Sequence, residues 1–263
     1  MNQALTTAYL ERLGIIGPVP ADGATLRELQ YRHLLTVPFE NLSIHLREEI
    51  ELVGNELVRK VVERRRGGFC YELNGAFATL LTELGYSVTL LSARVFQEGS
   101  LGVPYDHLVL RATAADGSGS WLAEVGFGEA FLQPLRWESR AEQQDPAGVF
   151  QLVEAEYGDL DLLQNGVPQY RLDTRPRELA EFEPTCWYHR TSPRSHFTRG
   201  PMCTRLTEEG RVTLAGRKLK ITEGGAKRET DLPDDSAVLR AYQEHFGIEL
   251  DQVPVPLRAD RPR

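Results

Sequence analysis

The sequence predicts an α+β protein built from an N-terminal helical bundle, a central antiparallel β-sheet or small β-barrel, and a C-terminal α/β lid. Apolar residues recur at helical spacing up to Gly85, and from Tyr86 they give way to β-branched and apolar runs separated by turn residues. No helical pattern interrupts those runs, which favours antiparallel pairing over βαβ units. After Pro176 helical and strand patterns mix. We therefore expect domains at residues 1–85, 86–185 and 186–263.

Four helices are expected in the first domain, over residues 4–13, 24–35, 55–65 and 70–84. The first stops at Gly14 and the last at Gly85, because glycine readily adopts the left-handed backbone of a helix C-terminus. The second ends before Val37-Pro38, because the residue before proline avoids the helical region.

Strands are expected in the central domain over residues 87–96, 107–112, 121–125, 149–153 and 169–172. In the last part of the chain they are expected over 195–206, 211–214 and 218–222. A short helix is expected at 178–180 and a final helix at 235–246. The tail from Asp251 is rich in proline and charge, so we expect it to be loosely ordered.

Charge and hydropathy exclude several classes of function. The 263 residues include 30 Lys and Arg against 38 Asp and Glu, a net charge of −8, and the longest basic run is Arg64-Arg65-Arg66. Nucleic acid is therefore not an expected partner, because phosphates require clustered basic residues. No apolar run approaches the ~20 residues needed to span a bilayer, so a membrane is not expected either. The N-terminus lacks the features of a signal peptide, which predicts a cytoplasmic protein.

The three cysteines are Cys70, Cys186 and Cys203. An odd number without an export signal predicts free thiols in a reducing compartment. No pair has Cys-x-x-Cys spacing, so no metal site is expected. We expect Cys186 and Cys203 to be structural, although His189 lies three residues from Cys186 and leaves another role open.

The segment Arg66-Gly67-Gly68-Phe69-Cys70 carries the clearest chemical signal. Two glycines permit a sharp turn, and Cys70 then begins a helix. A thiol at that position faces the positive end of the helix dipole and several unpaired N–H groups, which favour a thiolate and can hold an oxyanion. Most single cysteines are small buried hydrophobic residues, so this segment alone does not establish a nucleophile.

A thiolate nucleophile needs a base, and the base needs a group that orients it. His107 begins an apolar strand, and Glu124 is an acid within the apolar run 121–127. Each has an ordinary alternative, a core or surface histidine and an outward-facing strand residue. Together with Cys70 they fit an acyl-transfer triad.

Five segments resemble the motifs of the arylamine N-acetyltransferase family, and they occur in that family's order. The segments are Val-Pro-Phe-Glu-Asn-Leu (37–42), Arg-Gly-Gly-Phe-Cys-Tyr-Glu-Leu-Asn (66–74), Asp-His-Leu (106–108), Val-Gly-Phe-Gly (125–128) and Thr-Ser-Pro-Arg-Ser-His-Phe (191–197). The resemblance implies a helical bundle, a β-barrel and a lid around a cysteine-protease-like core.

The resemblance also implies an activity. Acetyl-CoA, a substrate rather than a permanently bound cofactor, acylates Cys70, and the thioester passes to an aromatic amine, hydrazine or hydroxylamine. His107 is then the proton partner of Cys70. Glu124 stands where the family usually has Asp, which leaves the rate and pH profile open, and Cys186 stands where the family commonly has Asn.

Further residues take roles from the same resemblance. Glu40 and Arg66 are expected to form a buried ion pair that supports the segment before Cys70. An aromatic wall for the acceptor is expected from Phe39, Phe69, Phe127 and Phe197, although plain core packing is an alternative for each. Gly126 and Gly128 would let coenzyme A approach closely. The candidates for its phosphates are Arg194, Arg199, Arg205, Lys218 and Lys220.

Two other functions stay open from sequence. The same Cys-His-Glu triad serves an amide synthase or a thioester hydrolase if another amine or water reaches the thioester. A binding module that keeps the fold without the chemistry is a second alternative. The oligomeric state, monomer or homodimer, is also open.

Overall fold

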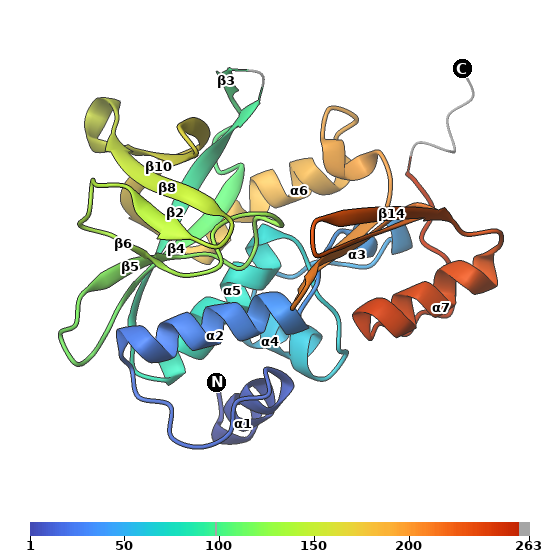
Figure 1. Cartoon of the computed structure of the whole chain (residues 1–263), viewed down its shortest axis with the longest axis horizontal. Coiled ribbons are helices and arrows are strands. Elements are labelled where there is room, and N and C mark those ends of the chain that lie inside the picture. Colours follow the sequence, from blue (N-terminus) through green and yellow to red (C-terminus); the bar gives the residue numbers. More distant parts are fainter. Residues whose placement is uncertain (98, 258–263) are drawn as a thin grey trace.

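The computed structural model describes residues 1–97 and 99–257, and its chain order is helices, then barrel, then lid (Figure 1). The helices of the first part are α1 (Gln3–Arg12), α2 (Gly23–Thr36), α3 (Leu42–Leu46), α4 (Gly54–Val62) and α5 (Cys70–Glu83). Helix α5 is buried on nearly all sides, because it packs against α4 on one side and against the barrel on the other. Among the described residues, no helix combines the length and apolarity that crossing a membrane requires.

The barrel is a nine-stranded antiparallel sheet that curls until it is nearly closed (Figure 1). Its strands are β2 (Ser87–Gln97), β3 (Ser100–Leu101), β4 (His107–Thr113), β5 (Ser120–Ala123), β6 (Leu135–Arg136), β7 (Gln143–Asp145), β8 (Gly148–Glu154), β9 (Leu160–Gln164) and β10 (Val167–Arg177). They pair in the order β6-β5-β4-β2-β10-β9-β8-β7, with β3 on β2. The predicted antiparallel barrel is therefore confirmed.

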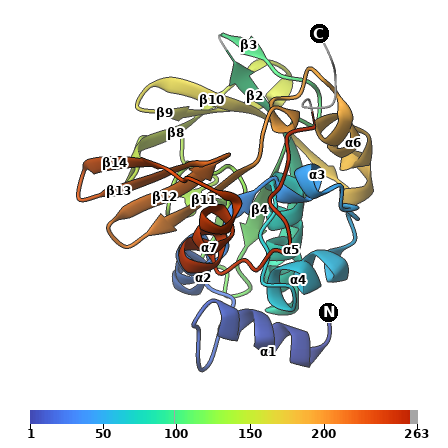
Figure 2. The same cartoon turned by 90° about the vertical axis from the view of Figure 1, so that its right-hand side faces the viewer.

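The lid is built on a second antiparallel sheet in the order β1-β11-β12-β13-β14. Its members are β1 (Phe39–Glu40), β11 (Met202–Thr207), β12 (Gly210–Ala215), β13 (Lys218–Glu223) and β14 (Ala226–Asp231). Helix α7 (Asp235–Phe246) packs on β11 and β12, with Tyr242 and Phe246 buried in the contact (Figure 2). Strand β1 comes from the helical part of the chain, just before α3, and pairs with β11. The first part of the chain therefore contributes one strand to the lid sheet.

Several local predictions need correction. The predicted helix at 178–180 is a 3-10 turn, Leu179–Phe182, that leads into α6 (Glu183–Thr191). Helix α6 was not predicted, because only one face of a mostly polar sequence is buried. The strand predicted over 195–206 begins only at Met202, since Ser195 caps a 3-10 turn by accepting a hydrogen bond from the Phe197 N–H.

The tail from Asp251 forms no helix or strand in the described part up to residue 257, but it is fixed to the rest of the fold at one point. Pro254 is buried, and the Val255 carbonyl lies 3.3 Å from His45 Nδ1. The rest of the tail prediction falls on residues 258–263, outside the described residues.

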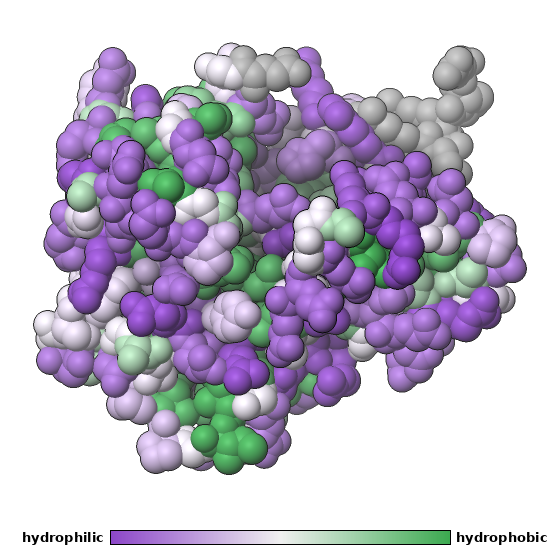
Figure 3. Space-filling view, in the orientation of Figure 1, coloured by the Kyte–Doolittle hydropathy of each residue, from purple (hydrophilic) through white to green (hydrophobic). Residues whose placement is uncertain are grey.

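Polar side chains cover most of the face seen in Figure 3, with apolar ones in small groups.

The Cys loop, residues 66–69, is held by backbone contacts to Pro38-Phe39-Glu40. The Glu40 N–H donates to the Gly68 carbonyl at 2.9 Å, and Phe39 forms a parallel bridge with Gly68. A Cβ on Gly67 would lie 1.8 Å from the Pro38 carbonyl oxygen. Neither Gly67 nor Gly68 adopts positive φ. The two glycines are therefore required by close approach rather than by the sharp turn expected from sequence.

Replacing Gly67 by alanine tests this packing. The Cβ would meet a backbone atom that cannot rotate away, so we expect Gly67→Ala to destabilise the fold by about 2 kcal/mol or more. Thermal unfolding should then show a melting temperature lower by about 4–8 °C. Gly200→Ala is the matched control, because nothing lies within 4 Å of its Cβ position. Equal melting temperatures for the two variants would show that the loop is not packed as described.

Candidate active site

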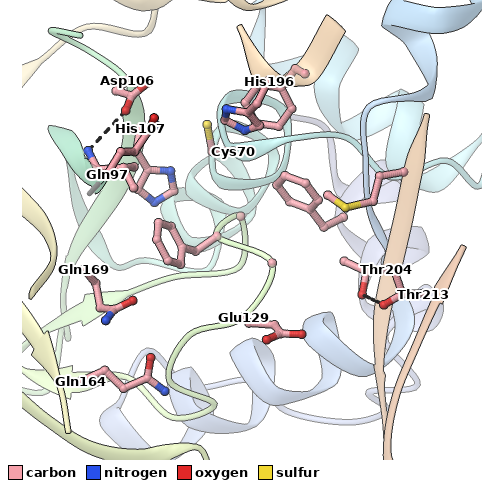
Figure 4. Close-up of a pocket in the computed structure, with 17 residues that line it drawn as sticks. Cys70, Gln97, Asp106, His107, Glu129, Gln164, Gln169, His196, Thr204 and Thr213 are labelled. Atoms are coloured by element: carbon pink, nitrogen blue, oxygen red, sulfur yellow. Dashed lines mark hydrogen bonds between the residues drawn. The ribbon is translucent and has the colours of Figure 1, made fainter. Parts of the chain in front are cut away.

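A pocket of about 540 Å³ opens where the barrel, the start of α5 and the lid meet (Figure 4). Cys70 lines it from α5, His107 from the start of β4, and Thr204 and Thr213 from the lid. In the view of Figure 4, the Cys70 sulfur lies between His107 on one side and His196 on the other. The volume is typical of a site for a small molecule.

Cys70 is the first residue of α5, as predicted, and its side chain is almost fully buried. Burial raises the pKa of the Cys70 thiol well above its usual value, and the carboxylates of Glu124 and Asp106 act in the same direction. A backbone hydrogen bond from Leu108 opposes this by favouring the thiolate. The helix start alone therefore does not make Cys70 a thiolate, and a neighbouring base is required.

His107 is buried and lines the same pocket as Cys70. Its Nε2 lies 2.6 Å from Glu124 Oε2, which leaves Nδ1 as the ring nitrogen available to Cys70. The ring packs against Phe127 and Tyr170, with centroid separations of 5.0 and 5.4 Å. The imidazole is thus oriented by its contact with Glu124 and by two neighbouring aromatic rings that are tilted relative to it.

Glu124 follows β5 and has an exposed fraction of 0%. Besides His107, its carboxylate accepts hydrogen bonds from Asn74 Nδ2 at 2.7 Å and from the Gly126 N–H at 2.8 Å. These contacts supply the partners that a buried charge needs. The structure therefore brings together the three side chains that the sequence proposed as a triad.

Asn74 and Gln30 are site residues that sequence reasoning missed. Asn74 Nδ2 also donates to the Leu108 carbonyl at 2.6 Å, and Asn74 Oδ1 accepts from the Val125 N–H at 3.0 Å. Gln30, buried in α2, accepts from the Glu124 N–H at 3.0 Å. A signal existed for Asn74: it follows Cys70 by four residues, so the two side chains lie on the same face of the helix.

Gly126 and Gly128 both line the pocket. A Cβ on Gly126 would lie 2.8 Å from Cys70 Cα, so this glycine lets the barrel loop approach the start of α5. Gly128 has a φ of +89°, which a side chain would strain. Both glycines thus have structural reasons of their own, beside the expected approach of coenzyme A.

The four phenylalanines differ in their position. Phe39, Phe127 and Phe197 line the pocket, whereas Phe69 is fully buried and does not. The Phe69 ring lies 5.3 Å from that of Phe197, edge to face. Phe69 therefore packs against Phe197 on the side away from the pocket. The expectation that Phe69 forms part of the aromatic wall is wrong.

Under the Cys loop, Arg66 Nε donates to Glu40 Oε1 at 2.9 Å, the ion pair expected from sequence. Burial alone would raise the pKa of Glu40, but the charges of Arg66 and Lys60 hold it below its usual value. Arg66 also contacts Glu48, and Lys60 Nζ lies 2.5 Å from Glu72 Oε1. A network of opposite charges, most of them buried, thus lies beneath the Cys loop.

A second histidine–carboxylate contact lies beside the pocket and was not predicted. His189 Nε2 is 3.1 Å from Asp106 Oδ1, and His189 Nδ1 is 3.1 Å from Ser195 Oγ. All three residues are buried, and Ser195 is occupied as the cap of the turn before β11. This chain of contacts ties α6 and the lid to the strand that begins with His107.

The other thiols are buried and lack the surroundings of Cys70. Burial raises the pKa of Cys186 to about 12 and that of Cys203 well above its usual range. All three cysteines are free. Within residues 1–97 and 99–257, no group of three His, Cys, Asp or Glu side chains is placed to hold a metal ion.

The five basic candidates for phosphate binding separate into groups. Arg205 is bound to the carbonyls of His245 and Leu35, which gives it a structural role. Lys220 and Lys218 lie 3.2 and 3.8 Å from Glu229. Arg194 and Arg199 are exposed, and in sequence they lie two residues before and three residues after His196, which lines the pocket.

Comparison with known proteins agrees with this geometry. A family model described as N-acetyltransferase matches residues 22–255. The arylamine N-acetyltransferase of Mycolicibacterium smegmatis is 34% identical over 252 residues, which cover 92% of this chain and 91% of that protein. Both matches include the Cys loop, the barrel and the lid.

Solved structures show the same fold. The Mycobacterium marinum arylamine N-acetyltransferase in complex with CoA has a TM-score of 0.83 and 32% identity, and the match covers 92% of each chain. An arylamine N-acetyltransferase from Bacillus cereus, described as having a unique Cys-His-Glu catalytic triad, has a TM-score of 0.86 at 24% identity, covering 95% of this chain and all of that one. The predicted α+β fold with its cysteine-protease-like core is confirmed.

The family model and the Mycolicibacterium relative both extend over most of the sequence. The chain therefore belongs to the arylamine N-acetyltransferase family and is an acyltransferase.

Proposed function

We propose that the protein transfers an acetyl group from acetyl-CoA, through a thioester on Cys70, to an aromatic amine, hydrazine or hydroxylamine. The observation that carries this proposal is the arrangement of Cys70 and His107 in one pocket, with His107 held by the buried Glu124 at 2.6 Å. A nucleophile, its base and the group that orients the base are thus provided by three different elements.

In the first half-reaction, His107 already holds the thiol proton as an imidazolium, and the thiolate sulfur of Cys70 attacks the carbonyl carbon of acetyl-CoA. The resulting oxyanion forms near the start of α5, where the first backbone N–H groups have no partner within the helix. Collapse breaks the bond between the carbonyl carbon and the sulfur of coenzyme A. The imidazolium of His107 then protonates the departing thiolate, leaving acetyl-Cys70 and free coenzyme A.

In the second half-reaction, the acceptor nitrogen attacks the thioester carbon and His107 accepts the proton that this nitrogen loses. The carbon–sulfur bond to Cys70 breaks, and the departing thiolate and the protonated His107 restore the ion pair of the resting site. Both half-reactions need the same sulfur and the same pocket, so coenzyme A leaves before the amine reacts. Phe39, Phe127 and Phe197 suit a flat aromatic acceptor through ring contacts and burial of area.

Glu124 has the role of stabilising the imidazolium. Because burial raises the pKa of Cys70, a thiolate in this site needs a positive counter-ion, and His107 supplies it only when its own charge is balanced. The longer glutamate fits because its Oε1 turns back to the Gly126 N–H while Oε2 contacts His107. The Cys-His-Glu triad described for the Bacillus cereus protein provides a precedent on the same fold.

For the donor, the complex of the Mycobacterium marinum relative with CoA supports a coenzyme A thioester as substrate. Arg194 and Arg199 are the proposed contacts for its phosphates, because they are exposed beside the pocket residue His196. Gly126 and Gly128 border the path of its thiol end.

The three free thiols suit a reducing, cytoplasmic compartment. The oligomeric state, monomer or homodimer, stays a prediction.

Intact mass spectrometry tests the main proposal. After mixing with acetyl-CoA alone, the protein should gain the mass of one acetyl group, located on Cys70, and lose it when an aniline is added. Cys70→Ala should show no gain, whereas Cys186→Ala should behave like the native protein. Loss of the acetyl group at the same rate without amine would favour a thioester hydrolase, and lack of any acetylation would favour the binding module.

The orientation of His107 is tested by changing Glu124. In Glu124→Gln an amide replaces the acceptor of the Nε2 proton, so we expect acetylation of Cys70 to slow by at least about 100-fold. Glu124→Asp keeps the charge but is one methylene short, so a smaller loss of about tenfold is expected. Stopped-flow release of coenzyme A measures both rates. Native rates in Glu124→Gln would remove Glu124 from the mechanism.

The pH dependence of Cys70 alkylation tests the source of the thiolate. With His107 present, iodoacetamide should label Cys70 at neutral pH. In His107→Gln the counter-charge is lost, and burial keeps the thiol protonated until the pH exceeds the ordinary cysteine value of about 8.5. Labelling at pH 7 should then fall by at least about tenfold. An unchanged pH profile in this variant, with the labelled site mapped to Cys70, would contradict the thiolate–imidazolium pair.

A further inference from the structure

Two glutamines of one hairpin line the pocket on the side away from Cys70 and His107. Gln164 ends β9 and Gln169 lies in β10, and both are partly buried. The turn between them contains Asn165 and Gly166 with φ of 50° and 78°, the pattern of a tight two-residue hairpin. Figure 4 shows both side chains directed into the pocket. The position of the two amides is therefore set by a short, regular hairpin.

Hydrogen bonds to backbone carbonyls fix the orientation of the side-chain amides of Gln164 and Gln169. Gln164 Nε2 donates to the Ala147 carbonyl and Gln169 Nε2 donates to the Val167 carbonyl, both at 3.0 Å. A carbonyl oxygen can only accept, so a reversed amide would place oxygen against oxygen. The atom that each glutamine offers to the pocket is its Oε1, as seen in Figure 4. This wall therefore presents hydrogen-bond acceptors.

The charged residues that line the pocket also disfavour an anionic acceptor. Its lining includes the carboxylates of Asp106 and Glu129, whereas none of the described lining residues is Lys or Arg. Glu129 Oε1 lies 3.3 Å from Arg211 Nε, but the Glu129 side chain is 78% exposed, so this pairing is weak. Asp106 lies at the other end of the pocket and contacts His189, so an anionic group beside the two glutamines would meet the Glu129 carboxylate and the two amide oxygens.

We infer that the pocket selects aromatic acceptors that carry a hydrogen-bond donor, such as a carboxamide, at the end remote from the reacting amine, and disfavours those that carry a carboxylate. The inference rests on the proposed acetyl transfer, which places the amine at Cys70. When a ring fills the pocket, Gln164 Oε1 and Gln169 Oε1 lose water, and a donor on the ring restores their hydrogen bonds. An acceptor without a donor leaves them unsatisfied.

Three acceptors of similar shape test this: 4-aminobenzamide, methyl 4-aminobenzoate and 4-aminobenzoate. The amide and the ester are neutral and withdraw electrons from the amine in a similar way, so they differ mainly in hydrogen-bond donors. We expect kcat/KM for the amide to exceed that for the ester by about 5- to 10-fold, the effect of one net hydrogen bond. The carboxylate should be the poorest. Equal values for amide and ester in the native protein would overturn the inference.

The variants locate the effect. In Gln164→Leu/Gln169→Leu the ratio of amide to ester should fall to about one, because both oxygens are removed with little change in volume. Gln144→Leu, at an exposed position of β7 outside the pocket, is the matched control and should keep the native ratio. A preference that survives in a folded double variant would overturn the assignment. If that variant does not fold, the comparison of the three acceptors with native protein still decides.

Charge is tested separately with Glu129→Gln, which should raise kcat/KM for 4-aminobenzoate by about 3- to 10-fold relative to the ester. No change would refute the electrostatic part of the inference. Acetylation of Cys70 by acetyl-CoA alone is measured in parallel for every variant. Absent acetylation in the native protein refutes the proposed function, whereas normal acetylation without acceptor preference refutes only this inference.

Discussion

The buried carboxylate of Glu124 is the group on which the rest of the site depends. With an exposed fraction of 0%, it is tolerated only because His107, Asn74 and the Gly126 N–H donate to it or contact it within 2.6–2.8 Å. These partners belong to β4, to α5 and to the loop after β5. Removing one partner of such a buried charge typically costs about 3–5 kcal/mol. Helix and barrel are therefore fixed relative to each other by the same group that orients the imidazole, so stability and site geometry cannot be varied independently.

The lid is joined to this centre by contacts of two kinds. Strand β1 pairs with β11 in the register Phe39 to Thr204, which places one residue of the Cys-loop support and one of the lid side by side in the pocket wall. On the other side, His189 of α6 contacts Asp106, the residue before His107. The first is a backbone ladder and the second a buried polar contact, so the lid is positioned by the strand that supports the Cys loop and by the segment that carries His107.

Much of this arrangement was predictable from sequence, and the exceptions have physical reasons. The pattern of apolar residues located most of the helices and the first barrel strands, because those elements bury a continuous face. It missed β14, whose six residues are all exposed, and α6, whose sequence is mostly polar. The three proposed triad residues followed from local signals, and the position of Asn74 four residues after Cys70 was a further local signal. Gln30 contacts Glu124 from a distant segment, which no local pattern shows. The division into domains at residues 85 and 185 stays a prediction. Two elements do not follow these boundaries: β1 belongs to the lid sheet, and α6 begins at Glu183, before residue 185.

The acidic balance of the chain bears on how an anionic donor is bound. Asp106 and Glu129 line the pocket while none of its described lining residues is Lys or Arg, so phosphates are disfavoured inside it. Under the proposed function, the uncharged thiol end of coenzyme A enters this pocket, and its phosphates stay outside, near Arg194 and Arg199, which precede and follow His196 in sequence. The net charge of −8 is compatible with that proposal, because the donor then requires cations only where its phosphates lie. In the proposed mechanism the thiolate of Cys70 depends on His107 for its counter-charge, because the pocket lining supplies no Lys or Arg among the described residues.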